Sequence, residues 1–251
     1  MNGQVTIPNS MTLRDDQPPI AFESALNAMI IVAHPIEETL LAGGLMQMVP
    51  HWRWRVISFC PGPNRERRRT FFEAMKRFEA MGSIADLNEG YTQQPLHDET
   101  VESEIELELP NSDFDLVITH NPFGEYSRHI RHEEVSRGVT SLWKRRLLRA
   151  KELWYFAYSD EERAHLPSAI ETAHLSVSLS ETVWQRKQEI MSDVYGFSKE
   201  SWAYRTTPRH EAFWRFHSPE EAFSWQLRKC FDYMDMSVFP YGEKATPPYR
   251  A

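Results

Sequence analysis

The sequence predicts an α/β fold: a Rossmann-like, doubly wound, mostly parallel sheet with a helical C-terminal extension. Short apolar runs alternate with segments of helical periodicity, and the connections are long enough for crossover helices. The apolar runs stop abruptly at polar residues, as buried parallel strands do where they reach the edge of a sheet. The run over 28–33 ends at His34, and the run over 115–119 ends at His120.

The other elements follow from two patterns, continuous apolar runs for strands and apolar residues every three or four positions for helices. In chain order they are a helix after His34 that ends by Pro50, a strand over 52–59, a helix over 71–81 that Gly82 ends, a strand over 84–87, an acidic helix over 102–109, the strand 115–119, a helix containing 135–143, and strands over 152–158 and 174–179. Each strand-helix-strand unit predicts neighbouring parallel strands.

The chain is expected to form a single domain over 1–251, because its length suits one substantial core. Residues 1–21 are polar and punctuated by proline, which predicts an extended N-terminal arm. Residues 181–251 predict a helical, aromatic-rich tail packed on the core. Within this tail, Ser218 is expected to cap a helix that runs to about Phe231.

The composition excludes several functional classes. Apolar residues make up 41% of the chain, too many for wholesale disorder, and no apolar run approaches the roughly 18 residues of a membrane-spanning helix. The net charge of −8 argues against a general nucleic-acid binder. Cys60 and Cys230 are the only cysteines and no secretory signal is visible, so we expect a cytoplasmic protein without disulfides. Homo-oligomerisation is left open.

Potential metal ligands gather at two of the predicted strand ends. His34 and Glu37 follow the first strand, and the loop after 115–119 carries His129 and His132. The carboxyl ends of neighbouring parallel strands meet at one edge of the sheet, where open α/β proteins bind ligands. Catalytic zinc typically takes three such ligands, imidazoles and a carboxylate among them, and keeps one position for water. His34, Glu37 and one of His129 or His132 supply such a set.

These residues carry a resemblance to a known family. The segment 34–39, His-Pro-Ile-Glu-Glu-Thr, with Gly43 and Gly44 resembles the A-H-P-D-D-E-x-x-x-x-G-G signature of the LmbE-like (PIG-L) zinc N-deacetylases, and 124–132 resembles their G-E-Y-G-H-x-x-H motif. Looser matches lie at Glu73, Gly82, Lys187, Tyr195 and 211–213. Members have a Rossmann-like fold and remove the N-acetyl group from glucosamine-containing substrates. The resemblance implies a metal-dependent hydrolase of the amide bond in an N-acetylated amino sugar or sugar conjugate.

Carried over by position, the resemblance implies these ligands for Zn²⁺ or another divalent metal: His34, Glu37 and His132. His129 would then be the histidine that stabilises the oxyanion of the tetrahedral intermediate. His120 and Tyr126, near the same motif, are expected to contact the substrate, a small sugar or sugar conjugate.

The sequence departs from the family at two positions of the signature. Ile36 stands where members have the aspartate that serves as general base, and Glu37 stands where they have a shorter aspartate ligand. A missing general base typically lowers the rate by about 10² to 10⁴. Glu38 and Glu125 are candidate substitutes. Three hypotheses follow: an impaired N-deacetylase, a non-catalytic sugar- or metal-binding relative, and a hydrolase with a relocated base.

Four arginines lie at the start of the helix after the second strand: Arg65, Arg67, Arg68 and Arg69. They are either a solvated helix start or part of the substrate site. Positive side chains at a helix N-terminus are unfavourable with the macrodipole, and an anion bound there would offset this. In the second interpretation Arg67 and Arg69 bind the substrate, which carries an anionic group such as a phosphate.

Overall fold

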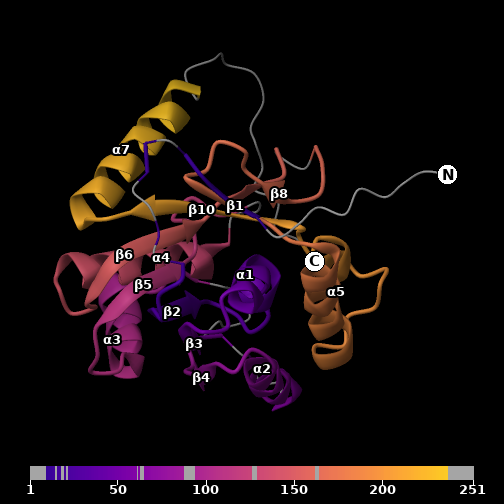
Figure 1. Cartoon of the computed structure of the whole chain (residues 1–251). Helices are drawn as coiled ribbons and strands as arrows, with labels where there is room; N and C mark the ends of the chain where they lie inside the picture. Colours follow the sequence, from indigo (N-terminus) through magenta and orange to yellow (C-terminus); the bar gives the residue numbers. More distant parts are fainter. Residues whose placement is uncertain are drawn as a thin grey trace.

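The structure is a computed structural model that describes residues 10–14, 16–17, 20, 22–60, 62, 65–87, 94–125, 129–161 and 164–236, without the side chains of 231–236. Its centre is an eight-stranded sheet (Figure 1). From one edge to the other the strands are β1 (Ser10–Leu13), β9 (Leu175–Ser178), β10 (His210–Phe216), β6 (Ala150–Phe156), β5 (Phe114–Thr119), β2 (Asn27–Val32), β3 (Arg53–Ser58) and β4 (Met81–Ile84). A separate pair is formed by β7 (Tyr158–Ser159) and β8 (Ser168–Ala169).

The five strands from β6 to β4 run parallel, and β10, β9 and β1 extend the sheet in antiparallel fashion. The predicted mostly parallel α/β sheet is therefore confirmed. The strand β2 shows why the apolar runs are continuous. Ile30 and Val32 belong to the core on one face of the sheet, and Met29 and Ile31 to the core on the other. A strand buried on both faces has no polar side to show.

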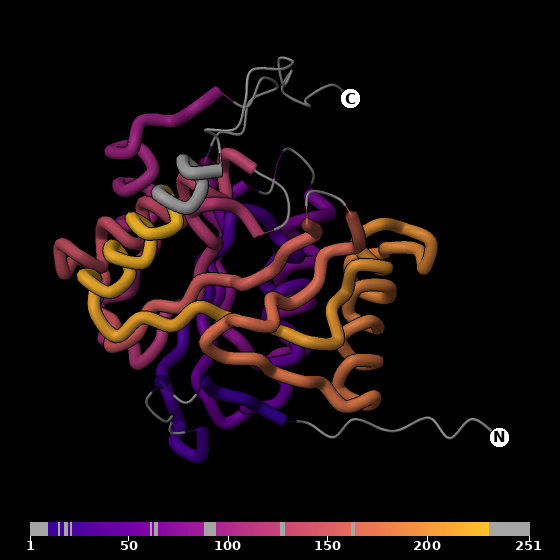
Figure 2. Tube along the Cα trace, turned by 90° about the horizontal axis from the view of Figure 1, so that it is seen from above, coloured from indigo at the N-terminus to yellow at the C-terminus, as the bar shows by residue number. Residues whose placement is uncertain are grey.

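Helices cover both faces of this sheet, as the two perpendicular views show (Figures 1 and 2). One core contains apolar side chains of α1 (Glu37–Met48), α2 (Arg65–Arg77) and α5 (Glu181–Glu189). The other contains side chains of α3 (Asp98–Glu108), α4 (Ile130–Lys144) and α7 (Pro219–Met236). A π-helical turn, η1 (Ile190–Val194), continues α5, and α6 (Trp202–Arg205) is a short helix. In the described part of the chain, no helix is long and apolar enough to cross a membrane.

The predicted helical tail over 181–251 is wrong in one part, because it contains the strand β10. The strand pairs with both β6 and β9, and six of its seven residues are buried. Its charged side chains hide the strand pattern in the sequence. Glu211 and Arg215 are both buried, and each is balanced by an ion pair, with Lys187 and Glu152 respectively. The last helix begins as expected, since the backbone N–H of Glu221 donates to Ser218 Oγ.

Two further expectations need correction. The N-terminal arm over 1–21 contains β1, which pairs with β9 at one edge of the sheet. Gly82 does not end a helix, because α2 stops at Arg77 and Gly82 lies inside β4, which itself begins three residues before the expected strand over 84–87. The glycine is needed for packing instead. A Cβ on Gly82 would lie 2.7 Å from Met75 Cγ, so the missing side chain lets α2 approach the strand.

Candidate active site

The candidate site forms where β2 and β5 end side by side. These strands pair in parallel, with Ile31 opposite Thr119, so the residues that follow each strand leave the same edge of the sheet. His34 follows β2, and His120 follows β5. Each chain segment then enters a helix whose first turns face this edge: α1 carries Glu37, and α4 carries His132. The topology thus brings together residues that are about 90 positions apart in the sequence.

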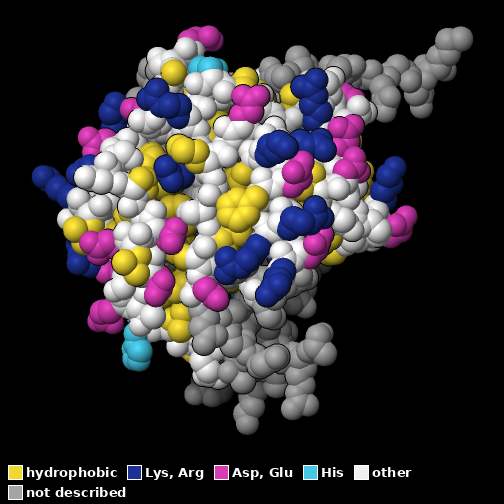
Figure 3. Space-filling view, turned by 90° about the horizontal axis from the view of Figure 1, so that it is seen from below, with side chains coloured by type: hydrophobic (Ala, Val, Ile, Leu, Met, Phe, Trp, Pro, Cys, Tyr) yellow, Lys and Arg dark blue, Asp and Glu magenta, His cyan; other side chains and the backbone are white. Residues whose placement is uncertain are grey.

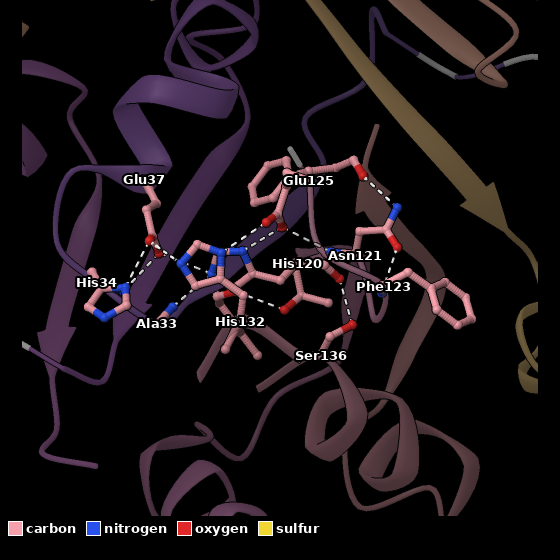
Figure 4. A network of polar contacts seen from close by, with 12 residues as sticks. Ala33, His34, Glu37, His120, Asn121, Phe123, Glu125, His132 and Ser136 are labelled. Carbon is pink, nitrogen blue, oxygen red and sulfur yellow. Dashed lines mark hydrogen bonds and ion pairs between the residues drawn. The ribbon is translucent and has the colours of Figure 1, made fainter. Parts of the chain in front are cut away.

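The carboxylate of Glu37 lies at the centre of this group (Figure 4). Its Oε1 atom is 2.8 Å from His34 Nδ1 and 2.6 Å from His132 Nε2. Its Oε2 atom is 3.0 Å from His120 Nε2 and accepts the backbone N–H of His34 at 2.8 Å. One carboxylate therefore contacts three imidazoles, and its side chain is 9% exposed.

A second carboxylate, Glu125, lies on the far side of two of these rings. Its Oε1 atom is 2.7 Å from His120 Nδ1, and its Oε2 atom is 2.9 Å from His132 Nδ1. The backbone N–H of Asn121 also donates to Oε1. His120 and His132 stack with ring centroids 4.0 Å apart and planes 20° apart. Glu37, His120, Glu125 and His132 thereby close a ring of hydrogen-bonded groups, visible in Figure 4.

The electrostatics of this ring favour positive charge. Burial opposes ionisation of Glu125, but the charges and hydrogen bonds of His120 and His132 outweigh it and hold the pKa of Glu125 well below its usual value. Burial likewise disfavours a charged His120, yet Glu125 and Glu37 raise the pKa of His120 to about 9. His120 Nε2 lies 3.0 Å from Glu37 Oε2 and 2.9 Å from the backbone nitrogen of Ala33. A protonated His120 donates through Nε2 to Glu37, and a deprotonated His120 accepts the N–H of Ala33 there instead.

The donor atoms fit a divalent metal ion. In the described residues, two overlapping groups have their ligand atoms within 4.8 Å of one another: His34, His129 and His132, and Glu37, His120 and His132. The set predicted from the sequence, His34, Glu37 and His132, spans both groups. Imidazole nitrogens and a carboxylate oxygen are the donors that zinc prefers, and carboxylates that hydrogen-bond the outer nitrogens of ligating histidines are a recurrent feature of zinc sites. Glu125 has this arrangement behind His132.

His129, expected to stabilise an oxyanion, is the N-cap residue of α4. Its ring packs edge-on against His34, with centroids 4.8 Å apart, and lies 4.7 Å from the ring of His132. It is partly exposed, whereas His132 is buried. His129 is therefore placed beside the candidate ligands at the side of the site that solvent reaches.

The backbone at Ile36 is strained. This residue precedes α1 and has a φ of 103°, a region that β-branched residues rarely adopt. Its N–H donates to Glu38 Oε2 at 3.0 Å, and Tyr195 donates its hydroxyl to Glu38 Oε1 at 2.5 Å. Thr39 also donates to Oε1. Strain of this kind costs about 1 to 3 kcal/mol and persists where the surroundings enforce it. Here Glu38 and Tyr195 supply that enforcement.

The candidate substitute bases are both deeply buried. Glu38 is fully buried, burial raises its pKa, and both of its oxygens accept the hydrogen bonds just described. Glu125 is 3% exposed, and both of its oxygens contact histidines. His120, expected to contact the substrate, is fully buried inside the ring. Tyr126 lies outside the described residues. The geometry therefore places His120, Glu38 and Glu125 behind the site.

The arginines at the start of α2 lie mostly at the surface. Arg67 is exposed and Arg68 is half-buried. A Cβ on Gly62 would lie 3.7 Å from a terminal guanidinium nitrogen of Arg67, so this side chain lies beside the segment between β3 and α2. Arg69 is exposed and paired with Glu66 at 2.5 Å. Figure 3 views the lower side of the molecule, where α2 lies, and shows several Lys and Arg side chains with hydrophobic ones between them.

Sequence reasoning missed a buried ion pair next to the histidine motif. Arg131 and Glu134, in the first turns of α4, are paired at 2.5 Å and are each 1% exposed. Arg131 donates to the carbonyl oxygen of Gln94, and Glu134 accepts the backbone N–H of Leu96. The pair ties the segment before α3 to the start of α4. Its signal in the sequence is the spacing of three residues, which places opposite charges on one side of a helix.

No family model matches the sequence, and a search among curated proteins finds no match. Solved structures do match. N,N'-diacetylchitobiose deacetylase from Pyrococcus horikoshii is similar with a TM-score of 0.56 at 14% identity, over 78% of this chain and 85% of that chain. A deacetylase of the A40926 pseudoaglycone is similar with a TM-score of 0.53 at 13% identity, over 78% and 99%. The chain shares the fold of these deacetylases.

A third solved structure with this fold has another activity. GalB, the 4-carboxy-2-hydroxymuconate hydratase from Pseudomonas putida, is similar with a TM-score of 0.54 at 12% identity, over 88% of this chain and 100% of that chain. At identities this low, the structural similarity establishes the fold and nothing more. The expected Rossmann-like architecture is confirmed. One fold hosts more than one chemistry, so the activity has to be argued from the residues of the site.

Proposed function

We propose that this chain is a zinc-dependent hydrolase of the amide bond in an N-acetylated amino sugar or sugar conjugate. The observation that carries the proposal is the convergence of His34, Glu37 and His132 at the carboxyl edge of the sheet, with Glu125 hydrogen-bonded behind His132. Two deacetylases share the fold that presents these residues. The low number of cysteines, two in 251 residues, supports the proposed cytoplasmic setting.

Zinc bound by these residues would supply a Lewis acid and lower the pKa of water. The chain itself provides the remaining chemistry. We propose that His129, which is partly exposed and lies beside His34, donates a hydrogen bond to the oxyanion that develops on the acetyl carbonyl. Ile36 offers a hydrocarbon side chain at the position of the family's general base. We therefore propose that wild-type turnover is slow.

We further propose that Arg67 binds an anionic group of the substrate, such as a phosphate. The support is its position in the first turn of α2, which follows β3 at the carboxyl edge of the sheet, while Arg69 is engaged by Glu66. Guanidinium groups recognise phosphate through paired hydrogen bonds. The comparison that tests this is the affinity for a neutral N-acetyl sugar and for its nucleotide-linked form, in wild type, Arg67→Gln and Arg69→Gln. Arg67→Gln should weaken the binding of the nucleotide-linked ligand only. If all three proteins bind both ligands with equal affinity, both arginines are solvated surface residues.

The metal is tested by elemental analysis. Wild-type protein should take up about one zinc ion per chain, and a variant with His34→Ala and His132→Ala should take up far less. The matched control is His174→Ala, a half-buried histidine whose partners lie on β10. Equal metal content in all three proteins would reject the ligand assignment.

A second candidate function is the addition of water to a carbon–carbon double bond. It is favoured by two observations together: Ile36 replaces the base that amide hydrolysis uses, and a hydratase shares the fold over 88% of this chain. The test is a parallel assay of an N-acetyl sugar panel, by acetate release, and of 4-carboxy-2-hydroxymuconate, by loss of its absorbance. Activity on the second alone would replace the deacetylase proposal. Binding without turnover of either class would favour the non-catalytic alternative.

A further inference from the structure

The closed ring of Glu37, His120, Glu125 and His132 contains two members that the proposed reaction does not use. We propose that His120 and Glu125 are positioning residues: His120 fixes the second oxygen of Glu37, and Glu125 fixes the rings of His120 and His132. The inference rests on the proposed function, because the residues held in place are its metal ligands. It explains how a glutamate can serve where the family has the shorter aspartate.

The first step concerns the length of Glu37. Its additional methylene gives the carboxylate one more rotatable bond than an aspartate has, and fixing that bond costs conformational entropy. The structure shows what fixes it. Oε2 is held by His120 Nε2 at 3.0 Å and by the backbone N–H of His34 at 2.8 Å. Oε1 is then left facing His34 and His132, the other two candidate ligands.

The second step concerns the rigidity of His120. Its Nε2 atom lies 2.9 Å from the backbone nitrogen of Ala33 on the neighbouring chain segment, and its Nδ1 atom contacts Glu125. Its backbone carbonyl accepts the hydroxyl of Ser136 from α4 at 2.6 Å. The side chain is fully buried, so it cannot reach a substrate. A side chain anchored to both segments in this way can set the position of Glu37 without taking part in the chemistry.

The third step concerns Glu125. Each of its oxygens contacts a different ring of the stacked pair, and the carboxylate is 1% exposed. This holds the two imidazoles parallel and fixes which edge of each faces Glu37. Carboxylates that orient ligating histidines typically contribute 10- to 100-fold in metal affinity.

The test is a double-mutant cycle on metal affinity. Zinc dissociation constants are measured by competition with a chelator for wild type, His120→Gln, Glu37→Asp and the double variant. In the wild-type background, His120→Gln should weaken zinc binding about 10- to 100-fold. In the Glu37→Asp background, the shorter carboxylate does not reach His120, so the same substitution should change the affinity less than about threefold. Equal losses in both backgrounds would show a merely structural role and overturn the assignment of His120.

Glu125→Gln is the second variant and keeps the inference testable if His120→Gln does not fold. It should weaken zinc binding about 10- to 100-fold and alter the visible absorption spectrum of the cobalt-loaded protein, because His132 loses its fixed orientation. His174→Gln is the matched control and should leave both unchanged. If Glu125→Gln keeps the wild-type zinc affinity and the wild-type cobalt spectrum, the inference is overturned, but the proposed function is not. A wild type that binds neither zinc nor cobalt would overturn the proposed function as well.

Discussion

The ammonium group of Lys187 lies 2.6 Å from a carboxylate oxygen of Glu211, and both side chains are fully buried. The same carboxylate accepts the backbone N–H groups of Gly44 and Leu45 within α1, each at 2.7 Å. Burial lowers the pKa of Lys187, although Glu211 opposes the shift. These contacts tie α5 and β10 to the helix that begins with Glu37. Support for the site therefore comes from the C-terminal part of the chain.

Lys187→Met should destabilise the fold strongly. The substitution leaves the charge of Glu211 buried with two N–H donors only, and removing one partner of a buried ion pair typically costs about 3 to 5 kcal/mol. Lys76→Met, at an exposed position of α2, is the matched control and should change the free energy of unfolding by less than about 0.5 kcal/mol. Urea denaturation measures both. Similar midpoints for the two variants would show that the buried pair contributes little.

The two glycines of the signature should respond differently to alanine. A Cβ on Gly44 would lie 2.4 Å from both Cδ atoms of Leu179 and 2.8 Å from Glu211 Oε1, whereas a Cβ on Gly43 would meet nothing closer than 3.3 Å, at Phe78 Cζ. Gly44→Ala should therefore cost roughly 1 to 3 kcal/mol or more through overpacking. Gly43→Ala gains up to about 1 kcal/mol of helix propensity, which offsets its milder crowding. The comparison is made by thermal or urea unfolding, and equal losses would contradict it.

The central parallel strands β2 and β5 were predictable because they are buried on both faces and are followed by His34 and His120. The strand β10 was not predictable, because its charged residues interrupt the apolar pattern of a buried strand. Glu211 and Arg215 look like surface residues until Lys187 and Glu152, distant in the sequence, are seen beside them. Pairing of this kind depends on tertiary packing, which composition and periodicity do not report.

In the candidate site, too, some contacts follow from the sequence and others do not. The convergence of His34 with His132 follows from the parallel topology, since both segments leave one edge of the sheet. The contact between His120 and Glu37 does not, because it depends on the side-chain length of one residue and on a ring buried behind it. Nor does the sequence reveal the φ of 103° at Ile36, since nothing in a β-branched residue indicates a left-handed conformation.

Stability should fall at alkaline pH because of Tyr155. Its hydroxyl is buried and contacts Thr140 and Gln226, and burial raises its pKa to about 12. The folded state keeps this proton between pH 10 and 12 while the unfolded state loses it. The stabilising contribution is therefore complete below pH 10 and lost as the pH rises to about 12, at roughly 1.4 kcal/mol per pH unit.

The measurement is urea unfolding of wild type and Tyr155→Phe from pH 8 to 11.5. The wild type should be the more stable protein at pH 8, because the variant loses the hydroxyl's hydrogen bonds. This advantage should shrink above pH 10, since phenylalanine has no proton to lose. Other lysines and tyrosines titrate in both proteins and cancel in the difference. A difference that stays constant with pH would show that Tyr155 ionises normally.

Ile36→Asp should raise N-deacetylase activity, and Ile36→Asn should not. Both side chains tolerate positive φ better than isoleucine does, so both relieve the strain before α1. Only the aspartate can accept a proton from the attacking water, and general-base assistance is worth about 10² to 10⁴ in rate, or roughly 3 to 5 kcal/mol. Acetate release from a panel of N-acetyl sugars, with zinc-loaded protein, compares the three. If Ile36→Asp and Ile36→Asn raise the rate equally, the effect comes from the relieved backbone strain. If wild type is already fast and Ile36→Asp lowers its rate, another residue of the site serves as the general base.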